Sequence, residues 1–173
     1  MKIAVLFSNG TEELEALTPV DVLKRAGVTV DIISVCDSVL VGSHDIKVQS
    51  NYLLKDVDLN SYDGIVIPGG MPGAEIISNN KIVLSALENF FAKNKLVAAI
   101  CASPALVLAR NGFIDGRKAT CYPSSDFVKL MAVTDYREEN VVVDGNLITA
   151  NGPRSAFAFS LAICDYLGFL PKF

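Results

Sequence analysis

Two patterns of apolar and polar positions alternate along the 173 residues. Short, mostly apolar and β-branched runs, typical of strands buried on both faces, lie at residues 2–7, 28–35, 64–68 and 96–101. Helical spacing of apolar residues appears between these runs, at residues 18–27 and 82–94. Because strands that alternate with helices build right-handed βαβ units, the pattern predicts a mainly parallel sheet with helices on both faces.

Residues at the expected helix ends support this interpretation. Thr18 is a candidate N-cap, Pro19 suits the first position of a helix, and Gly27 suits a stop. A closing helix is predicted over residues 153–168, which begin with Pro153 and end with Gly168.

Two segments depart from the rhythm. Residues 41–54 alternate without a helical stripe and predict a small β-excursion. Residues 140–152 place Asp144-Gly145 between two apolar runs, which predicts a β-hairpin. With no repeat, linker or low-complexity tract, the chain is interpreted as one α/β domain over residues 1–173.

Composition narrows the class of protein. A chain with 51% hydrophobic and 20% charged residues is expected to fold, and its net charge of −4 argues against a nucleic acid or anionic membrane partner. No apolar stretch approaches the ~20 residues of a membrane span, and the first ten residues lack the features of a signal peptide, so a cytoplasmic protein is expected. Four widely spaced cysteines predict free thiols and no zinc site: Cys36, Cys101, Cys121 and Cys164.

Candidate chemistry gathers where predicted strands end. Ligands of open parallel sheets bind outside the carboxyl ends of the strands. Cys101 ends the fourth run, Gly69-Gly70 follows the third, and the acidic stretch "TEELE" (11–15) follows the first. A thiol, a flexible backbone and a carboxylate are therefore expected at one edge of the sheet.

Cys101 has two interpretations at this stage. Pro104 and Gly112 mark a helix directly after it, and a helix N-terminus can lower a cysteine pKa below its usual ~8.5. Position alone is equally consistent with a buried cysteine that fills space. The sharp strand-to-helix turn resembles a nucleophile elbow, although the GxSxG pattern is absent.

The neighbouring polar residues also leave alternatives open. Glu12, Glu13 and Glu15 could form a solvated cluster at a helix start, or one of them could face the thiol as a proton donor, and periodicity does not choose among the three. The glycine pair could present N–H groups to an anion or serve a tight turn. His44, the single histidine, lies in the β-excursion and is interpreted as structural or exposed.

Four motifs, in order, resemble the ThiJ/PfpI superfamily and specifically its DJ-one branch of Parkinsonism-associated redox and deglycase-like proteins: "GTEELEALTPVDVLKRAG", "IVIPGGMPGA", "AICASPALVLA" and "ANGPRSAFAFSLAI". The resemblance implies a flavodoxin-like three-layer sandwich with a nucleophile elbow, and a homodimer. It also implies that Cys101 is the reactive cysteine and that Glu15 is the carboxylic acid that bonds it.

Further site residues follow from the same resemblance. Gly70 and Ala102 match positions whose N–H groups face a substrate oxygen or an oxidised sulfur, and Arg25 and His44 fall where relatives often carry arginines near the dimer interface and the thiol. Tyr122 stands where many relatives have a histidine before a proline. With a pKa near ~10, tyrosine is a poor base at neutral pH.

The function implied is a cysteine-dependent glyoxalase III or deglycase-like activity on α-oxoaldehydes or glycated adducts, with an oxidation-sensitive thiol and no metal or organic cofactor. Peptide hydrolysis, which must protonate an amine leaving group, is the least favoured chemistry without the histidine. Two alternatives remain: a non-enzymatic oxidative-stress sensor or redox-regulated chaperone, and an inactive structural paralogue, which Tyr122 suggests.

Overall fold

A seven-stranded sheet forms the centre of the protein, whose structure, a computed structural model, describes residues 1–173. The strand order is β10-β11-β7-β6-β1-β2-β5, and every neighbouring pair is parallel except β10 and β11. The strands of this sheet are β1 (Lys2–Phe7), β2 (Thr29–Ser34), β5 (Tyr52–Leu53), β6 (Gly64–Ile67), β7 (Leu96–Ile100), β10 (Val141–Asp144) and β11 (Leu147–Ala150). The predicted mainly parallel α/β sheet is confirmed.

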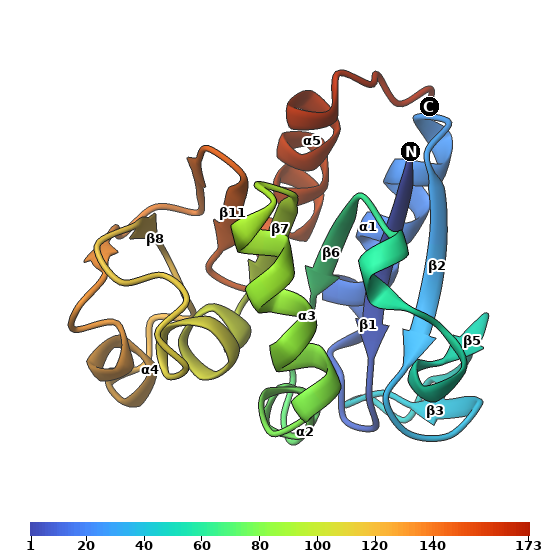
Figure 1. Cartoon of the computed structure of the whole chain (residues 1–173), viewed down its shortest axis with the longest axis horizontal. Helices are drawn as coiled ribbons and strands as arrows, with labels where there is room; N and C mark the ends of the chain where they lie inside the picture. The colour runs from blue at the N-terminus through green and yellow to red at the C-terminus, as the bar shows by residue number, and fades with distance from the viewer.

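Helices cover both faces of this sheet (Figure 1). The five α-helices are α1 (Glu13–Arg25), α2 (Gly73–Ser78), α3 (Lys81–Ala92), α4 (Ser125–Leu130) and α5 (Ala156–Leu167). A π-helix, η3 (Pro104–Ala109), and three 3₁₀ turns, η1 (Leu54–Asp56), η2 (Leu59–Ser61) and η4 (Pro153–Ser155), complete the helical elements. This three-layer arrangement is the flavodoxin-like sandwich that was expected.

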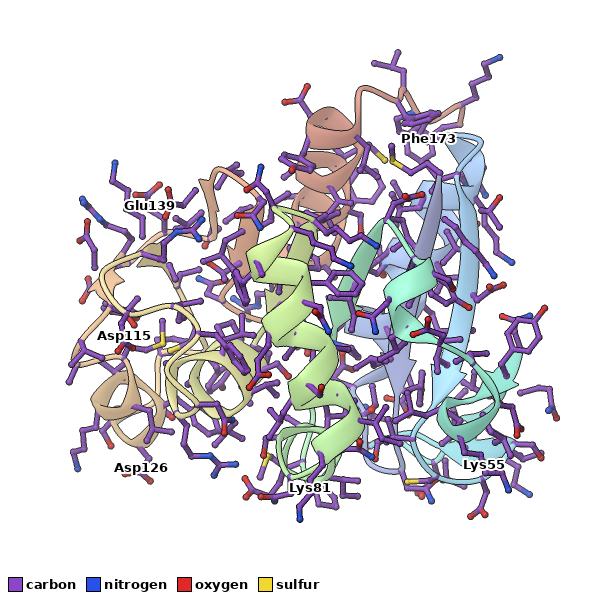
Figure 2. All side chains as sticks on the ribbon, viewed as in Figure 1. Lys55, Lys81, Asp115, Asp126, Glu139 and Phe173 are labelled. Carbon is purple, nitrogen blue, oxygen red and sulfur yellow. The ribbon has the colours of Figure 1, made fainter.

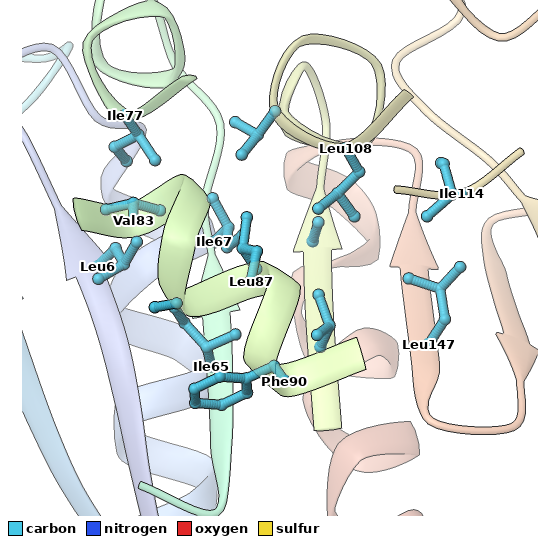
Figure 3. Close-up of a cluster of buried hydrophobic side chains, with 14 of the residues drawn as sticks. Leu6, Ile65, Ile67, Ile77, Val83, Leu87, Phe90, Leu108, Ile114 and Leu147 are labelled. Carbon is cyan, nitrogen blue, oxygen red and sulfur yellow. The ribbon is translucent and has the colours of Figure 1, made fainter. Parts of the chain in front are cut away.

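Alternate residues of each central strand pack into two separate hydrophobic cores, one on each face of the sheet. In β1, Ala4 and Leu6 face the core under α3 and η3, whereas Val5 and Phe7 face the core under α1 and α5. Figure 3 shows the first of these cores, where Val83, Leu87 and Phe90 of α3 lie over Ile65 and Ile67 of β6. Burial on both faces explains why these strands read as continuous apolar runs.

The helix predicted from Thr18 begins earlier than expected. The helix α1 starts at Glu13, and its N-cap is Glu12, whose side chain accepts a hydrogen bond from the Glu15 N–H. Pro19 therefore lies inside the helix and Thr18 caps nothing. Proline removes one intrahelical hydrogen bond, but Pro19 is buried among apolar neighbours, and packing overrides its local preference.

Both predicted β-segments form, with shifts in detail. The hairpin of β10 and β11 pairs Asp144 with Leu147, so its two-residue turn is Gly145-Asn146 instead of Asp144-Gly145. Asp144 stays in the strand because its carboxylate binds Arg117. Residues 41–54 contribute to a small antiparallel pair, β3 (Val39–Val41) and β4 (Lys47–Gln49), and to the edge strand β5. A third small sheet pairs β8 (Lys118–Ala119) with β9 (Asp135–Tyr136).

Charged side chains are spread around the outside of the molecule. In Figure 2, negatively charged acids and positively charged lysines lie at the periphery, among them Lys55, Lys81, Asp115, Asp126 and Glu139. None of the helices has the length and apolar composition that spanning a membrane requires. The residues of the candidate site lie in the loops beyond the carboxyl ends of β1, β6 and β7.

Candidate active site

Cys101 lies at a sharp turn directly after β7. Its φ of 65° is in the left-handed region, which is uncommon for a residue other than glycine. The Cys101 N–H donates to the Ala150 carbonyl at 2.8 Å, and its carbonyl accepts from the Tyr122 N–H at 2.7 Å. Two neighbouring segments thus hold the strained backbone in place, as a nucleophile elbow requires.

The helix after the thiol is a π-helix, whereas an ordinary helix start was expected. All six residues of η3 are buried, and Pro104 occupies its first position. Just before it, the buried Ser103 hydroxyl donates to the Pro68 carbonyl at 2.6 Å. This bond ties the elbow to the loop that follows β6, so the two backbone segments beside the thiol move as one unit.

Glu15 is the acid that faces the thiol, and it is fully buried. Its Oε2 accepts the Gly69 N–H at 2.8 Å, whereas Oε1 is buried without a hydrogen-bond partner. Gly69 has to be glycine here, because a Cβ would lie 2.6 Å from the Cys101 Cβ and 2.7 Å from Glu15 Oε2. The missing side chain is what lets the thiol and the carboxyl approach one another.

The backbone N–H groups of Gly70 and Ala102 face the Cys101 sulfur and lower the pKa of its thiol. Gly70 has a φ of 87°, and a Cβ there would overlap the backbone of Glu12. Because these donors belong to rigid, closely packed loops, they form a preorganised site for negative charge on the sulfur or on an oxygen bonded to the carbon it attacks.

The pKa values of the pair differ from the expectation of a thiol acidified by a helix terminus. Burial raises the pKa of Cys101, and the neighbouring Glu15 raises it further, while the Ala102 and Gly70 N–H groups act in the opposite direction. Burial also raises the pKa of Glu15 to about 7, against hydrogen bonds from the Cys101 thiol and the Gly69 N–H. Two adjacent buried groups cannot both be ionised cheaply, so the pair retains one proton near neutral pH.

Comparison with known proteins agrees with this arrangement. Residues 1–166 match the DJ-1/PfpI family. The chain belongs to that family. Among its DJ-1/PfpI relatives, DJ-1 homolog B of Arabidopsis thaliana is 39% identical over 95% of this chain, and protein dj-1beta of Drosophila melanogaster is 35% identical over 94% of it.

The extent of the match differs between relatives. This chain spans only 37% of the length of the Arabidopsis protein but 87% of the length of the Drosophila one. The solved structure of Toxoplasma gondii DJ-1 in an oxidized form superposes with a TM-score of 0.91 and 38% identity, over 96% of this chain and 90% of that one. The DJ-1/PfpI fold is therefore shared over nearly the whole domain.

The other two acids of the motif are buried as well, so the solvated cluster considered from sequence is not what forms. Glu13 accepts hydrogen bonds from the His44 N–H at 2.8 Å, the His44 Nδ1 at 2.9 Å and the Ser43 hydroxyl at 3.2 Å. Burial raises the pKa of Glu13, but these donors outweigh it and leave the pKa at about 2. Glu12, Glu13 and His44 carry donor atoms within 4.8 Å of one another, but the Glu13 oxygens are already engaged.

Arg25 and His44 do not reach the thiol. Arg25 lies ten residues beyond Glu15, about 15 Å along α1, where it pairs with Asp21 at 2.8 Å and stacks near Phe173. Arg25 is therefore excluded from the anion site, because the helix carries it to the amino-terminal edge of the sheet (Figure 1). The His44 side chain is 69% exposed and directed to Glu13, whose negative charge raises the His44 pKa.

Tyr122, at the position of the histidine in many DJ-1/PfpI relatives, is brought to the elbow by its backbone, and its side chain is 44% exposed. Sequence reasoning missed the roles of Gly69 and of the loop 43–46. The glycine pair was visible in the sequence, but which of the two lies between thiol and carboxyl is a matter of tertiary packing. The loop donors come from thirty residues away and leave no local signal.

Proposed function

We propose that this DJ-1/PfpI protein is a cysteine-dependent glyoxalase III or deglycase-like enzyme, with Cys101 as nucleophile and Glu15 as the residue that moves the proton. The observation that supports this most is the Glu15 carboxyl, buried against the thiol with one oxygen unpartnered. A buried unpaired oxygen is tolerated far better on a neutral carboxyl than on a carboxylate. In the resting pair the raised pKa of Cys101 keeps the shared proton on sulfur, and its transfer to the Glu15 carboxylate generates the reactive thiolate.

The proposed reaction needs only these groups. The Cys101 thiolate bonds to the aldehyde carbon of methylglyoxal, and Glu15 gives its proton to the carbonyl oxygen, which yields a hemithioacetal. The Glu15 carboxylate next removes the hydrogen from that carbon and returns it to the adjacent carbon, while the hydroxyl proton passes to the oxygen of the adjacent carbon, which converts the adduct to a lactyl thioester. Water hydrolyses the thioester, releasing lactate and one proton to solvent and restoring the Cys101–Glu15 pair with its single proton.

Backbone N–H groups are suited to both halves of this sequence. Gly70 and Ala102 stabilise the thiolate before attack, and the same donors can hold the oxyanion that water creates at the thioester. Tyr122 is a hydrogen-bond partner for the substrate in this proposal. Because no imidazole is available to protonate an amine, peptide hydrolysis is not part of the proposed function.

Lactate formation from methylglyoxal tests the proposal directly. We expect turnover in the wild-type protein and a loss of at least ~100-fold in Cys101→Ser. Cys36→Ser is the matched control, because Cys36 is also partly exposed but lies next to Ser8, away from Glu15. Wild-type turnover no higher than that of Cys101→Ser would end the enzymatic proposal.

A second candidate function is that of an oxidative-stress sensor or redox-regulated chaperone, and it is favoured by the same two N–H donors around a partly exposed thiol. It agrees with the oxidized form in which a relative was solved. Intact mass after dilute peroxide should show two oxygen atoms added at Cys101, and none in Cys101→Ser. Equal oxidation of Cys36 would argue against a dedicated sensor.

We also infer a cytoplasmic homodimer. Large apolar side chains are exposed near the start of α1 and on the neighbouring loop, with Leu14 59% and Ile46 52% exposed, and such patches are typical of subunit contacts. Sedimentation equilibrium should give twice the mass of the chain, and Leu14→Glu should give the single-chain mass. A monomer at micromolar concentration would contradict this inference.

A further inference from the structure

A groove of about 710 Å³ opens beside the elbow, and the proposed chemistry uses only its Tyr122. Most of its lining residues are polar, and they come from the loop after β8, the residue before β10 and the segment that joins β11 to α5. The side chains that matter here are Tyr122, Asn140, Asn151, Arg154 and Ser155. The volume is sufficient for a small organic molecule.

Both walls of the groove are bonded to the backbone of the nucleophile. Tyr122, on one wall, donates its N–H to the Cys101 carbonyl at 2.7 Å. Ala150, which leads into the other wall, accepts the Cys101 N–H at 2.8 Å. At Gly152 the walls touch, since a Cβ there would lie 3.3 Å from the Tyr122 ring. The groove therefore begins at the two segments that hold the Cys101 backbone.

Arg154 gives the groove its charge. It is the one charged residue in the lining, in a chain whose net charge is −4. It is exposed and takes part in none of the ion pairs of the structure. The acid Glu138 lines a separate pocket of about 320 Å³ that shares Pro123 and Asn151 with this groove.

The polar groups around Arg154 are held in place. Asn151 donates from Nδ2 to the Asn140 side chain at 3.1 Å, and its Oδ1 accepts the Ser155 hydroxyl at 2.6 Å. Ser155 is the N-cap residue of α5, but its hydroxyl bonds Asn151 and does not cap that helix. The positive amino-terminal end of α5 therefore adds to the guanidinium charge.

We propose that this groove binds the carboxylate of the substrate, so that the preferred substrate is an α-oxoaldehyde, or an adduct of one, that carries a carboxylate several bonds from the aldehyde. The inference rests on the proposed function, because it assigns a substrate class to the Cys101 site. A guanidinium forms two parallel hydrogen bonds with a carboxylate, and a groove without acids of its own favours that anion over neutral compounds. Arg154 is thus a specificity-determining residue.

Two aldehydes of equal chain length test this assignment. The probes are 4,5-dioxopentanoate, which carries the carboxylate, and 2-oxopentanal, which ends in a methyl group. We expect wild-type kcat/KM to favour the carboxylate by roughly tenfold, as suits a charge-assisted bond in an open groove. In Arg154→Ala this ratio should fall to about one while kcat/KM for 2-oxopentanal stays within about twofold.

Two further variants define the effect. Arg154→Lys keeps the charge but loses the paired donors, and should keep part of the preference. Lys129→Ala removes one positive charge from the exposed surface of α4 and should leave the ratio unchanged. A wild-type ratio near one, or a ratio that survives in Arg154→Ala, would overturn the assignment.

A binding measurement separates this inference from the proposed function. If neither aldehyde is turned over, the proposed function fails, and the carboxylate site is judged by the alkylation rate of Cys101 with iodoacetamide. Glutarate, with one carboxylate for Arg154 and one for the N–H groups of Gly70 and Ala102, should slow alkylation of the wild type severalfold and not that of Arg154→Ala. Equal rates with and without glutarate would reject the site.

Discussion

Glu13 and Glu15 stand two residues apart in one helix, both buried, yet their environments drive their ionisation in opposite directions. The Glu13 oxygens accept hydrogen bonds from the loop 43–46, and the pKa of Glu13 is about 2. Glu15 has a single N–H donor, from Gly69, and a thiol as its neighbour, and its pKa is about 7. The comparison teaches that depth of burial and the supply of donors together decide whether the carboxyl of a glutamate is held ionised or protonated.

The largest expected effect is the loss of turnover in Glu15→Gln. Glutamine keeps a donor near the sulfur but carries no transferable proton, so kcat/KM for methylglyoxal should fall by ~100-fold or more. The same change at Glu13 is the matched control and should leave turnover within about threefold. Assays of lactate formation for both variants check this. Similar losses in the two would show that the contrast between these acids has no catalytic meaning.

The second effect is the stability lost in Glu13→Gln. The folded-state pKa of about 2 lies below the ordinary 4.5, so ionised Glu13 stabilises the fold above pH 4.5, and this stability disappears as the pH falls through about 2. We expect a loss of ~2 kcal/mol at pH 7 that shrinks in acid. Urea unfolding at pH 7 and pH 3 measures it, and a pH-independent difference would point to packing instead of charge.

An effect of similar size and opposite sign is expected for the stability of Glu15→Gln. Because the folded-state pKa of Glu15 is raised to about 7, its contribution is fully present below pH 4.5 and is lost as the pH rises through 7. The amide does not titrate, so the variant should gain on the wild type by ~3 kcal/mol between pH 4.5 and pH 8. Thermal unfolding across that range tests the sign, and a variant that instead weakens with rising pH would contradict it.

The smallest effect belongs to His44→Ala. The side chain is mostly exposed, and its raised pKa means that the protonated imidazole stabilises the fold below the ordinary value of 6.5 and ceases to do so as the pH rises through the raised value. We expect a decrease in Tm of at most about 2 °C near pH 6, reduced by salt. A larger decrease at pH 9 than at pH 6 would show that the loop depends on the ring itself and not on its charge.

The sheet could be predicted closely from the sequence, since strands such as β1 and β7 are buried on both faces and appear as continuous apolar runs. The helix boundaries could be predicted less closely. The start of α1 was missed because a glutamate caps it and a proline lies within it, and local preference favours neither.

The candidate site also has features that could be predicted from the sequence and features that could not. Cys101 could be placed at a strand end from pattern alone, whereas the choice of Glu15 among three acids came from family resemblance. No periodicity reveals that loop 43–46 supplies the donors to Glu13, or that Arg25 lies at the far end of α1 from the thiol. Both features depend on contacts between segments that are far apart in the sequence, and local patterns of apolar and polar residues do not predict such contacts.

The backbone bonds of Cys101 have a consequence for motion. Its amide and carbonyl are both tied into the centre of the sheet, between the ends of β7 and β11 and the segment of Tyr122. Its amide proton should therefore exchange with solvent only when the whole domain opens, on the slowest timescale of the molecule.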